Sequence, residues 1–329
     1  MAAPPVSDRY SRQTVLAEVG SAGQARLEAA TVLVVGAGGL GCAVLQYLTA
    51  AGVGRLILID HDRVEESNLH RQPLYRVSDI GALKVDAARA SLRTLNPAVR
   101  IEGRAERLGA LNAGPLAASA DIVIDAADSL AVTYMLSDAC RASARPLVSA
   151  SIVGLTGYVG VFCGGAPSYR AVFPEMPRNP GSCAQSGVLG TAVGVLGTLQ
   201  AHLALALLLA WQPPVLGRLL SLDLRALHLA GFSFLGAPES PGDALRFIAP
   251  AEVAAGDLVI DLRTLAETPV SPFASALRVG VESLEGAELE LPRTSRIVLC
   301  CRTGVRAWRA ARALQRQGHA NVALVAMGE

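Results

Sequence analysis

The glycine-rich turn Gly36-Ala37-Gly38-Gly39-Leu40-Gly41 constrains the fold of this chain more than any other feature. It follows the apolar run 31–36, which is typical of a buried strand, and precedes an apolar helix predicted from Leu40 to Ala51. Gly36, Gly38 and Gly41 have the G-x-G-x-x-G spacing that lets backbone approach a phosphate at a helix N-terminus. The turn therefore predicts a phosphate-binding strand–turn–helix unit.

Strands and helices alternate along the chain beyond this turn. The predicted elements are strand 55–60, helix 82–95, strands 99–103 and 121–125, helix 131–143 and strand 146–150. Such alternation predicts a parallel sheet covered on both faces. Apolar and small residues alternate over 156–163 and 218–230, which predicts antiparallel strands added to that sheet. The fold class is α/β, a Rossmann-like, mostly parallel sheet with added antiparallel strands.

A second, smaller α/β unit is expected after the turn-forming segment Gly236 to Asp243. Its predicted elements are strands 257–261 and 296–300, helix 305–317 and strand 321–326. We therefore divide the chain into residues 1–235, a linker over 236–245, and residues 246–329.

Composition excludes several classes of protein. With 51% hydrophobic and 17% charged residues, the 329-residue chain is an ordered globular protein. The net charge of +1 and the lack of basic runs argue against a nucleic-acid partner. The segment Gly187 to Trp211 is long enough to span a bilayer. Because it contains Gln200 and His202 together with several glycines, we expect a buried core or dimer-interface helix, no membrane partner, and a cytoplasmic protein.

Lys84 is the single lysine among 29 basic residues. An ammonium group is a compact point charge, whereas a guanidinium is a planar fork, so the two are not interchangeable at a tight site. Lys84 is therefore either a functional cation or an incidental residue of a solvated helix.

The glycine turn alone favours a dinucleotide, with Asp60 at the end of the next strand on a ribose hydroxyl. The residues that follow favour a nucleoside triphosphate with a metal ion, since transferred phosphates need several cations. These residues are Asn68, Arg71, Gln72, Lys84 and Asp125-Ala126-Ala127-Asp128. A dinucleotide-dependent oxidoreductase stays open as the alternative.

Residues 9–235 resemble the ThiF/MoeB/HesA family, relatives of the ubiquitin-activating enzymes. The resemblance rests on six motifs: the glycine turn, Arg9-Tyr10-Ser11-Arg12-Gln13, Asp60-His-Asp-Arg-Val64, Ser67-Asn-Leu-His-Arg-Gln72, Gly81-Ala-Leu-Lys84 and Gly194-Val-Leu-Gly-Thr-Leu-Gln-Ala201. It implies ATP-dependent adenylation of the C-terminal glycine of a ubiquitin-like sulfur carrier that ends in Gly-Gly.

The resemblance also implies residue roles. The turn glycines, Gly39 included, would cradle ATP, and Asp60 would hold its ribose. Asn68, Arg71 and Lys84 would contact the phosphates, Gln72 would help to position ATP, and Asp128 would bind Mg²⁺. Arg12 would reach across a homodimer into the partner's site. Ser129 follows Asp128 where the family usually has Asn.

Cys183 matches the family cysteine that takes up the acyl or sulfur group, although an incidental loop cysteine is the alternative. Relatives usually carry a structural zinc bound by two C-x-x-C pairs. This chain has Ser168-Tyr169-Arg170-Ala171 at the first pair and no pair after Phe232. Because tetrahedral zinc needs its ligands, we expect no zinc.

The C-terminal unit resembles a rhodanese, with Cys301-Arg302-Thr303-Gly304-Val305-Arg306 matching the active loop. Loop amides and arginines at a helix start lower a thiol pKa and stabilise a persulfide. Two features leave alternatives open. Cys300 and Arg306 have the C-x5-R spacing of a phosphatase, and Phe273-Ala-Ser-Ala-Leu277 replaces a segment usual in rhodaneses, so the unit is either active or degenerate.

Together the two resemblances imply an adenylyltransferase fused to a sulfurtransferase. The enzyme would make a carrier thiocarboxylate, with a cysteine desulfurase or another sulfur donor as a partner. Thiamine thiazole synthesis is favoured over molybdopterin synthesis from the sequence around Cys183. A non-catalytic scaffold that binds the carrier is the rival outside the enzymes.

Overall fold

The computed structural model describes residues 8–177, 187–239, 245–287 and 289–328. Its larger sheet has eight strands in the order β3-β2-β1-β4-β5-β6-β7-β8. The strands are β1 Thr31–Val35, β2 Arg55–Ile59, β3 Arg100–Arg104, β4 Ile122–Asp125, β5 Pro146–Val153, β6 Thr156–Cys163, β7 Arg218–Asp223 and β8 His228–Ser233. β1 to β5 are parallel and β6 to β8 are antiparallel, which confirms the predicted fold class.

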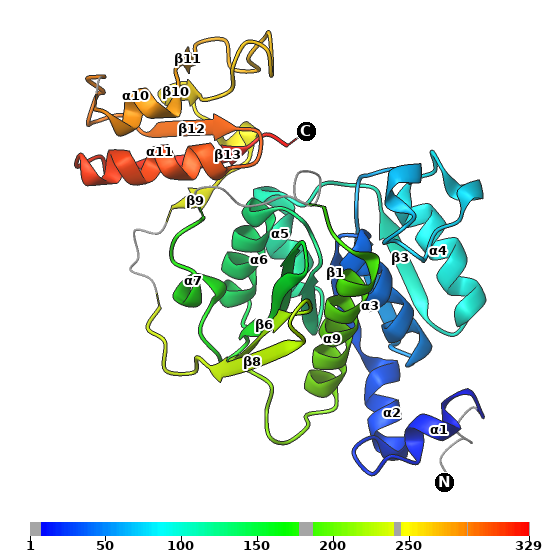
Figure 1. The fold of residues 1–329 in the computed structure, drawn as a ribbon. Coiled ribbons are helices and arrows are strands. Elements are labelled where there is room, and N and C mark those ends of the chain that lie inside the picture. The colour runs from blue at the N-terminus through cyan, green and yellow to red at the C-terminus, as the bar shows by residue number, and fades with distance from the viewer. Residues whose placement is uncertain (1–7, 178–186, 240–244, 288, 329) are drawn as a thin grey trace.

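Helices cover both faces of this sheet (Figure 1). Alternate residues of β1 and β2 point to opposite faces, so each strand is apolar on both sides. One face packs on α3 Gly39–Ala50, α4 Lys84–Leu95 and α9 Gly190–Leu208. The other packs on α5 Ala110–Ala118, α6 Leu130–Ala142 and α7 Tyr169–Val172. The short α1 Ser11–Thr14 and α2 Gly20–Ala29 precede β1.

Helix α9 occupies most of the apolar segment predicted as a core helix. Among the described residues it is the one helix long and apolar enough to span a bilayer, and half of it is buried. It packs on α3, β5 and β6. Gln200, polar in the middle of this helix, is fully buried and donates through Nε2 to the backbone oxygen of Asp125 at 2.7 Å. The side chain of Gln200 thus satisfies the backbone carbonyl at the end of β4.

The C-terminal residues form a second sheet of five parallel strands in the order β11-β10-β12-β13-β9. These strands are β9 Arg246–Phe247, β10 Leu258–Asp261, β11 Leu277–Arg278, β12 Ile297–Cys301 and β13 Val322–Ala326. Helices α10 Val281–Glu285 and α11 Val305–Arg316 accompany them. The first sheet ends at Ser233 and the second begins at Arg246, while the domain boundaries at 235 and 246 stay predictions.

The two sheets share one hydrophobic core. Leu33, Tyr134 and Phe162 of the first unit lie in the same buried cluster as Phe247 and Trp308 of the second. In Figure 1 the C-terminal unit, yellow to red, lies beyond the ends of α5 and α6. β9 packs directly on α6, so the second unit is docked on the first.

Candidate active site

The glycine turn connects β1 to α3 and leaves backbone amides uncovered. Gly36 has φ +100°, and a Cβ there would meet the backbone oxygen of Ala126 at 2.6 Å. A Cβ on Gly41 would lie 2.0 Å from the oxygen of Gly36, and one on Gly39 would lie 2.5 Å from Cγ1 of Val193. At Gly38, by contrast, the nearest atom is Nε2 of Gln72 at 3.9 Å. Helix α3 begins after Gly38 without a side-chain cap, which is the arrangement that binds phosphate.

Asp60 follows β2 and holds the turn in place. Its Oδ2 accepts a hydrogen bond from the amide of Ala37 at 2.7 Å, and its Oδ1 accepts one from the amide of Asp62 at 2.8 Å. The side chain is nearly buried at the carboxyl edge of the sheet. A carboxylate at this position fits a ribose hydroxyl.

Residues 68–72 lie across the turn from Asp60. Asn68 and Gln72 are both buried, and Oε1 of Gln72 has no hydrogen-bond partner among the described residues. Arg71 lies nearer the surface and donates to the backbone oxygen of Ser67 at 3.0 Å. An unpartnered buried oxygen beside an open glycine cradle fits a polar ligand at this place.

Lys84 is the first residue of α4 and is 6% exposed. Its Nζ lies 2.8 Å from Oδ2 of Asp62. Burial raises the pKa of Asp62, but the hydrogen bond and charge of Lys84 outweigh it and leave that pKa below its ordinary value. The one lysine therefore points into the site instead of into solvent.

Asp125 and Asp128 follow β4 and differ in environment. Asp125 is fully buried and accepts hydrogen bonds from Oγ1 of Thr133 at 2.7 Å and from Oγ of Ser149 at 2.8 Å. Burial raises its pKa to about 6 against these hydrogen bonds. Asp128 is exposed at the same edge and offers the free carboxylate.

Magnesium takes carboxylate oxygens and water, so Asp128 fits as a ligand. A second cluster was not predicted as a metal site: the ligand atoms of Asp60, His61 and Asp62 lie within 4.8 Å of one another. Because Nζ of Lys84 lies against Asp62, the ammonium group already neutralises part of the negative charge of that cluster.

Arg12 is not brought to this edge of its own chain. Arg12 is exposed, and its neighbour Gln13 donates to the backbone oxygen of Ala51 at the far end of α3. A helix of that length spans roughly 18 Å, so Arg12 is remote from the glycine turn of its own chain. Cys183 lies outside the described residues.

Cys301 ends β12, and its loop leads into α11. Its Sγ accepts hydrogen bonds from the amides of Gly304 at 3.2 Å and Ala307 at 3.4 Å, as the predicted loop of amides requires. Arg302 and Thr303 are exposed, Val305 is half-buried, and Cys301 itself has no exposed surface. The loop is therefore formed, with its thiol covered.

Neither Cys300 nor Arg306 is arranged as in a phosphatase. Cys300 faces the opposite side of the sheet among Val259, Val298 and Val325, and burial raises its pKa to about 12. Arg306 donates to Oε2 of Glu267 at 2.9 Å, and this hydrogen bond lowers the pKa of Glu267 to about 2. Cys300, which would be the nucleophile of a phosphatase with this C-x5-R spacing, is thus buried and protonated at neutral pH.

At the position of the first C-x-x-C pair of the relatives, the described residues form hydrogen bonds with the segment after β8. Ser168 and Ala171 replace the first pair, and Ser168 donates through its amide and Oγ to the two carboxylate oxygens of Glu239 at 2.8 and 2.7 Å. Arg170, beside it, donates to the backbone oxygen of Leu245 at 2.9 Å. Hydrogen bonds join the two segments that the metal would join.

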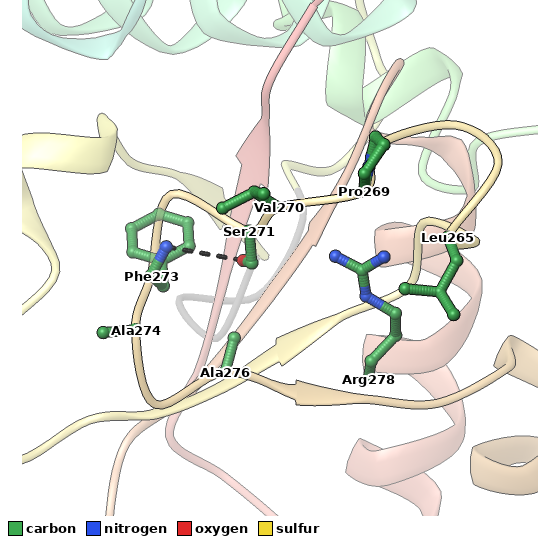
Figure 2. A pocket seen from close by; sticks show the side chains of 8 residues that line it. All are labelled: Leu265, Pro269, Val270, Ser271, Phe273, Ala274, Ala276 and Arg278. Atoms are coloured by element: carbon green, nitrogen blue, oxygen red, sulfur yellow. Dashed lines mark hydrogen bonds between the residues drawn. The ribbon is translucent and has the colours of Figure 1, made fainter.

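A hollow of about 660 Å³ lies away from the glycine turn (Figure 2). It is lined by residues between Leu265 and Arg278, including the unusual segment that begins at Phe273. Ser271 turns away to donate to Asp261 at 3.0 Å. The lining is mostly apolar, and Ser271 and Arg278 are its polar residues.

The uncapped amides of α3, Asp60, Gln72 and Lys84 meet at the carboxyl edge of a Rossmann-like sheet. This arrangement defines the class of nucleotide-binding α/β proteins. The chain belongs to the ThiF family, whose model matches residues 10–240.

Relatives of known name agree with this membership. Adenylyltransferase and sulfurtransferase MOCS3 of Bos taurus is 50% identical over 218 residues, 65% of this chain and 48% of that protein. The sulfur carrier protein adenylyltransferase of Thermus thermophilus is 46% identical over 225 residues, 66% of this chain and 83% of that protein. The SAMP-activating enzyme E1 of Haloferax volcanii is 41% identical over 237 residues, 71% and 87% of the two chains. The match thus spans about half the length of the MOCS3 protein.

Solved structures share the fold. MccB of E. coli, solved with ATP, superposes with a TM-score of 0.62 at 20% identity over 72% of this chain and 73% of its own. PaaA superposes with a TM-score of 0.60 at 22% identity over 71% and 76%. At these identities the likeness concerns the fold alone.

Proposed function

We propose that this protein is an adenylyltransferase that uses ATP to activate the C-terminal glycine of a ubiquitin-like sulfur carrier, and that it then transfers sulfur to that carrier. The observation that carries the proposal is the link between the uncapped glycine turn and the buried Lys84 at one edge of the sheet. Asp60 accepts from the amides of Ala37 and Asp62, and Oδ2 of Asp62 lies 2.8 Å from Nζ of Lys84. The names of the Thermus and Haloferax relatives support a carrier protein as the substrate.

In the first step the carrier carboxylate attacks the α-phosphorus of ATP and pyrophosphate leaves. The amides of α3 and Lys84 balance charge that develops on the phosphate oxygens. Asp60 orients the ribose, Gln72 offers its unpartnered Oε1, and Asn68 and Arg71 complete the polar wall. Mg²⁺ held by Asp128 would add charge neutralisation at the phosphates.

In the second step a persulfide on Cys301 attacks the acyl adenylate. The terminal sulfur bonds to the carbonyl carbon, the carbon–oxygen bond breaks, and AMP leaves with the electron pair. A second thiol, which we assign to Cys183, attacks Sγ of Cys301 and releases the thiocarboxylate with the electron pair of the broken sulfur–sulfur bond. A dithiol reductant then returns both cysteines to thiols, and a cysteine desulfurase resupplies the persulfide sulfur.

The active unit is a homodimer in this proposal. Arg12 is exposed and remote from its own glycine turn, which suits a role in a partner's site. The apolar side chains of Val15 and Leu16 nearby are 80% and 53% exposed, as expected for a surface that a second copy covers. We place the enzyme in the cytoplasm, without zinc, membrane or nucleic acid. Thiamine thiazole synthesis is the proposed pathway, and molybdopterin synthesis is the second candidate, which the MOCS3 name favours.

The test is ATP–pyrophosphate exchange with ubiquitin-fold proteins ending in Gly-Gly from the source organism. Exchange should require ATP, Mg²⁺ and one such carrier. Lys84→Arg should lower the exchange rate by about 100-fold or more, since the planar guanidinium of arginine cannot replace the compact ammonium charge of lysine. Arg89→Lys, on the exposed face of the same helix, is the matched control and should leave exchange unchanged. Stabilisation by NAD but not by ATP–Mg²⁺ would instead support an oxidoreductase, and binding of a carrier without exchange would support a scaffold.

A further inference from the structure

The loops at the carboxyl ends of the two sheets meet each other. Arg107, after β3, donates to the backbone oxygen of Met327, after β13, at 3.3 Å. The same guanidinium lies 2.9 Å from Nε2 of His61, next to Asp60. Gly304, after β12, has φ +86°, and a Cβ there would lie 3.2 Å from Cβ of Ala131, the second residue of α6. The edge that carries Cys301 thus abuts the edge that carries the nucleotide residues.

The docking contact that holds this arrangement is centred on Trp308 of α11, which is 2% exposed. Its ring lies 4.8 Å from that of Tyr134, and the guanidinium of Arg170 lies over both rings at 4.8 and 5.4 Å. Arg170 is itself buried and is paired with Asp138 at 2.6 Å.

A second contact is made at the rim of the junction. Arg312 of α11 lies 2.9 Å from Glu175 and donates to the backbone oxygen of Pro174 at 3.1 Å. Aromatic rings packed against a desolvated arginine form a stable contact. The C-terminal unit is therefore held against the first unit and is not merely tethered to it by a flexible linker.

The loop that carries Cys301 lies against the first turn of α6 in the adenylation unit of the same chain. Ala131, which packs on Gly304, lies three residues beyond Asp128, the proposed magnesium ligand. The start of α6 therefore links the contact with the sulfur loop to the proposed magnesium ligand. Transfer from the covered thiol would require the short segment 302–304, whose Arg302 and Thr303 are exposed, to shift.

We infer that sulfur is transferred in cis: Cys301 serves the adenylate formed at Lys84 of its own chain and not that of a dimer partner. The inference rests on the proposed function. A loosely tethered unit would serve either subunit, whereas a docked unit presents its loop to one adenylate only.

Mixed pairs of differently tagged chains test the inference. In the trans pair one chain carries Lys84→Arg and the other Cys301→Ala, so no chain has both groups. In the cis pair one chain is wild type and the other carries both substitutions. Each pair is purified through both tags and assayed for carrier thiocarboxylate by mass spectrometry. The carrier is one that supports exchange with the wild-type protein, and a cysteine desulfurase with L-cysteine supplies sulfur at amounts where free sulfide gives no product.

The cis pair should give about half the wild-type rate, because it has one intact chain of two. After both pairs are normalised to their pyrophosphate exchange, the trans pair should give about one-tenth of the cis pair or less. Equal rates in the two pairs would overturn transfer in cis. Thiocarboxylate from a protein with Cys301→Ala in both chains would overturn it too, because Cys301 would then not be the donor. Loss of exchange in the wild-type protein is a separate result that rejects the proposed function itself.

Discussion

Asp125 shows how a single buried carboxyl makes stability depend on pH. Its folded pKa of about 6 lies above the ordinary value of 3.8 because burial disfavours the charged form. The folded state therefore binds more protons than the unfolded state between these values. The free energy of unfolding contributed by this group is fully present below pH 3.8 and is lost as pH rises through about 6.

Asp125→Asn removes this titration while keeping an oxygen for Thr133 and Ser149. The wild-type protein should lose stability relative to the variant between pH 4.5 and 7.5, by about 2 kcal/mol. Urea unfolding of both proteins across that range checks it, since other titrating groups cancel in the difference. A constant difference would mean that Asp125 keeps its ordinary pKa in the folded protein.

At the scale of elements, the sequence predicted what apolar periodicity encodes. β1, β4, β6, β12 and α11 lie within a residue or two of the expected ranges because each has a clear apolar pattern. The segment predicted as strand over 218–230 is a hairpin of two strands, β7 and β8, with a turn between them. Helix α5 was not predicted, since Gly114 and Pro115 lie in its middle and both are unfavourable inside a helix.

The candidate site was likewise predictable only in part. Motif spacing and the meeting of strand ends predicted that Asp60, Gln72 and Lys84 approach the glycine turn. The pairing of Lys84 with Asp62, the contact of Arg107 with His61, and the covering of Cys301 were not predictable. Each depends on side-chain packing between residues that are distant along the chain, Arg107 and Met327 being 220 residues apart.

The clasp, the pair of hydrogen bonds from Ser168 to Glu239, joins the loop before α7 to the segment after β8. We propose that it takes the place of a zinc site. Arg141 adds a third contact to Glu239 at 3.3 Å. We expect metal analysis to find zinc well below one equivalent per chain and chelators to leave Tm unchanged. Glu239→Gln should lower the free energy of unfolding by about 1–2 kcal/mol, because the carboxylate accepts charge-assisted hydrogen bonds.

The exposed Glu290→Gln is the matched control and should change stability by no more than about 0.5 kcal/mol. One equivalent of zinc together with a chelator-induced fall in Tm would contradict the clasp.

For the whole molecule, the shared core argues that the two units unfold together. Separate domains joined by a linker would give two transitions, but Trp308 and Phe247 are buried in the same cluster as Tyr134 and Phe162. The chain has two tryptophans. Trp211 lies far from the junction between the units, and its Nε1 donates to the backbone oxygen of Glu18 at 2.9 Å. In a Trp211→Phe variant, fluorescence therefore reports on the junction alone.

Trp308 fluorescence in that variant and far-ultraviolet circular dichroism should give coincident urea transitions, as two-state unfolding requires. A Trp308→Ala substitution removes the centre of the docking contact and costs about 3–5 kcal/mol. Because the loss falls on the junction, calorimetry of this variant should resolve a second, earlier transition for the C-terminal unit. If the fluorescence change precedes the loss of helix in the Trp211→Phe protein, the C-terminal unit undocks before the first sheet unfolds, and the firm docking on which cis transfer depends does not hold.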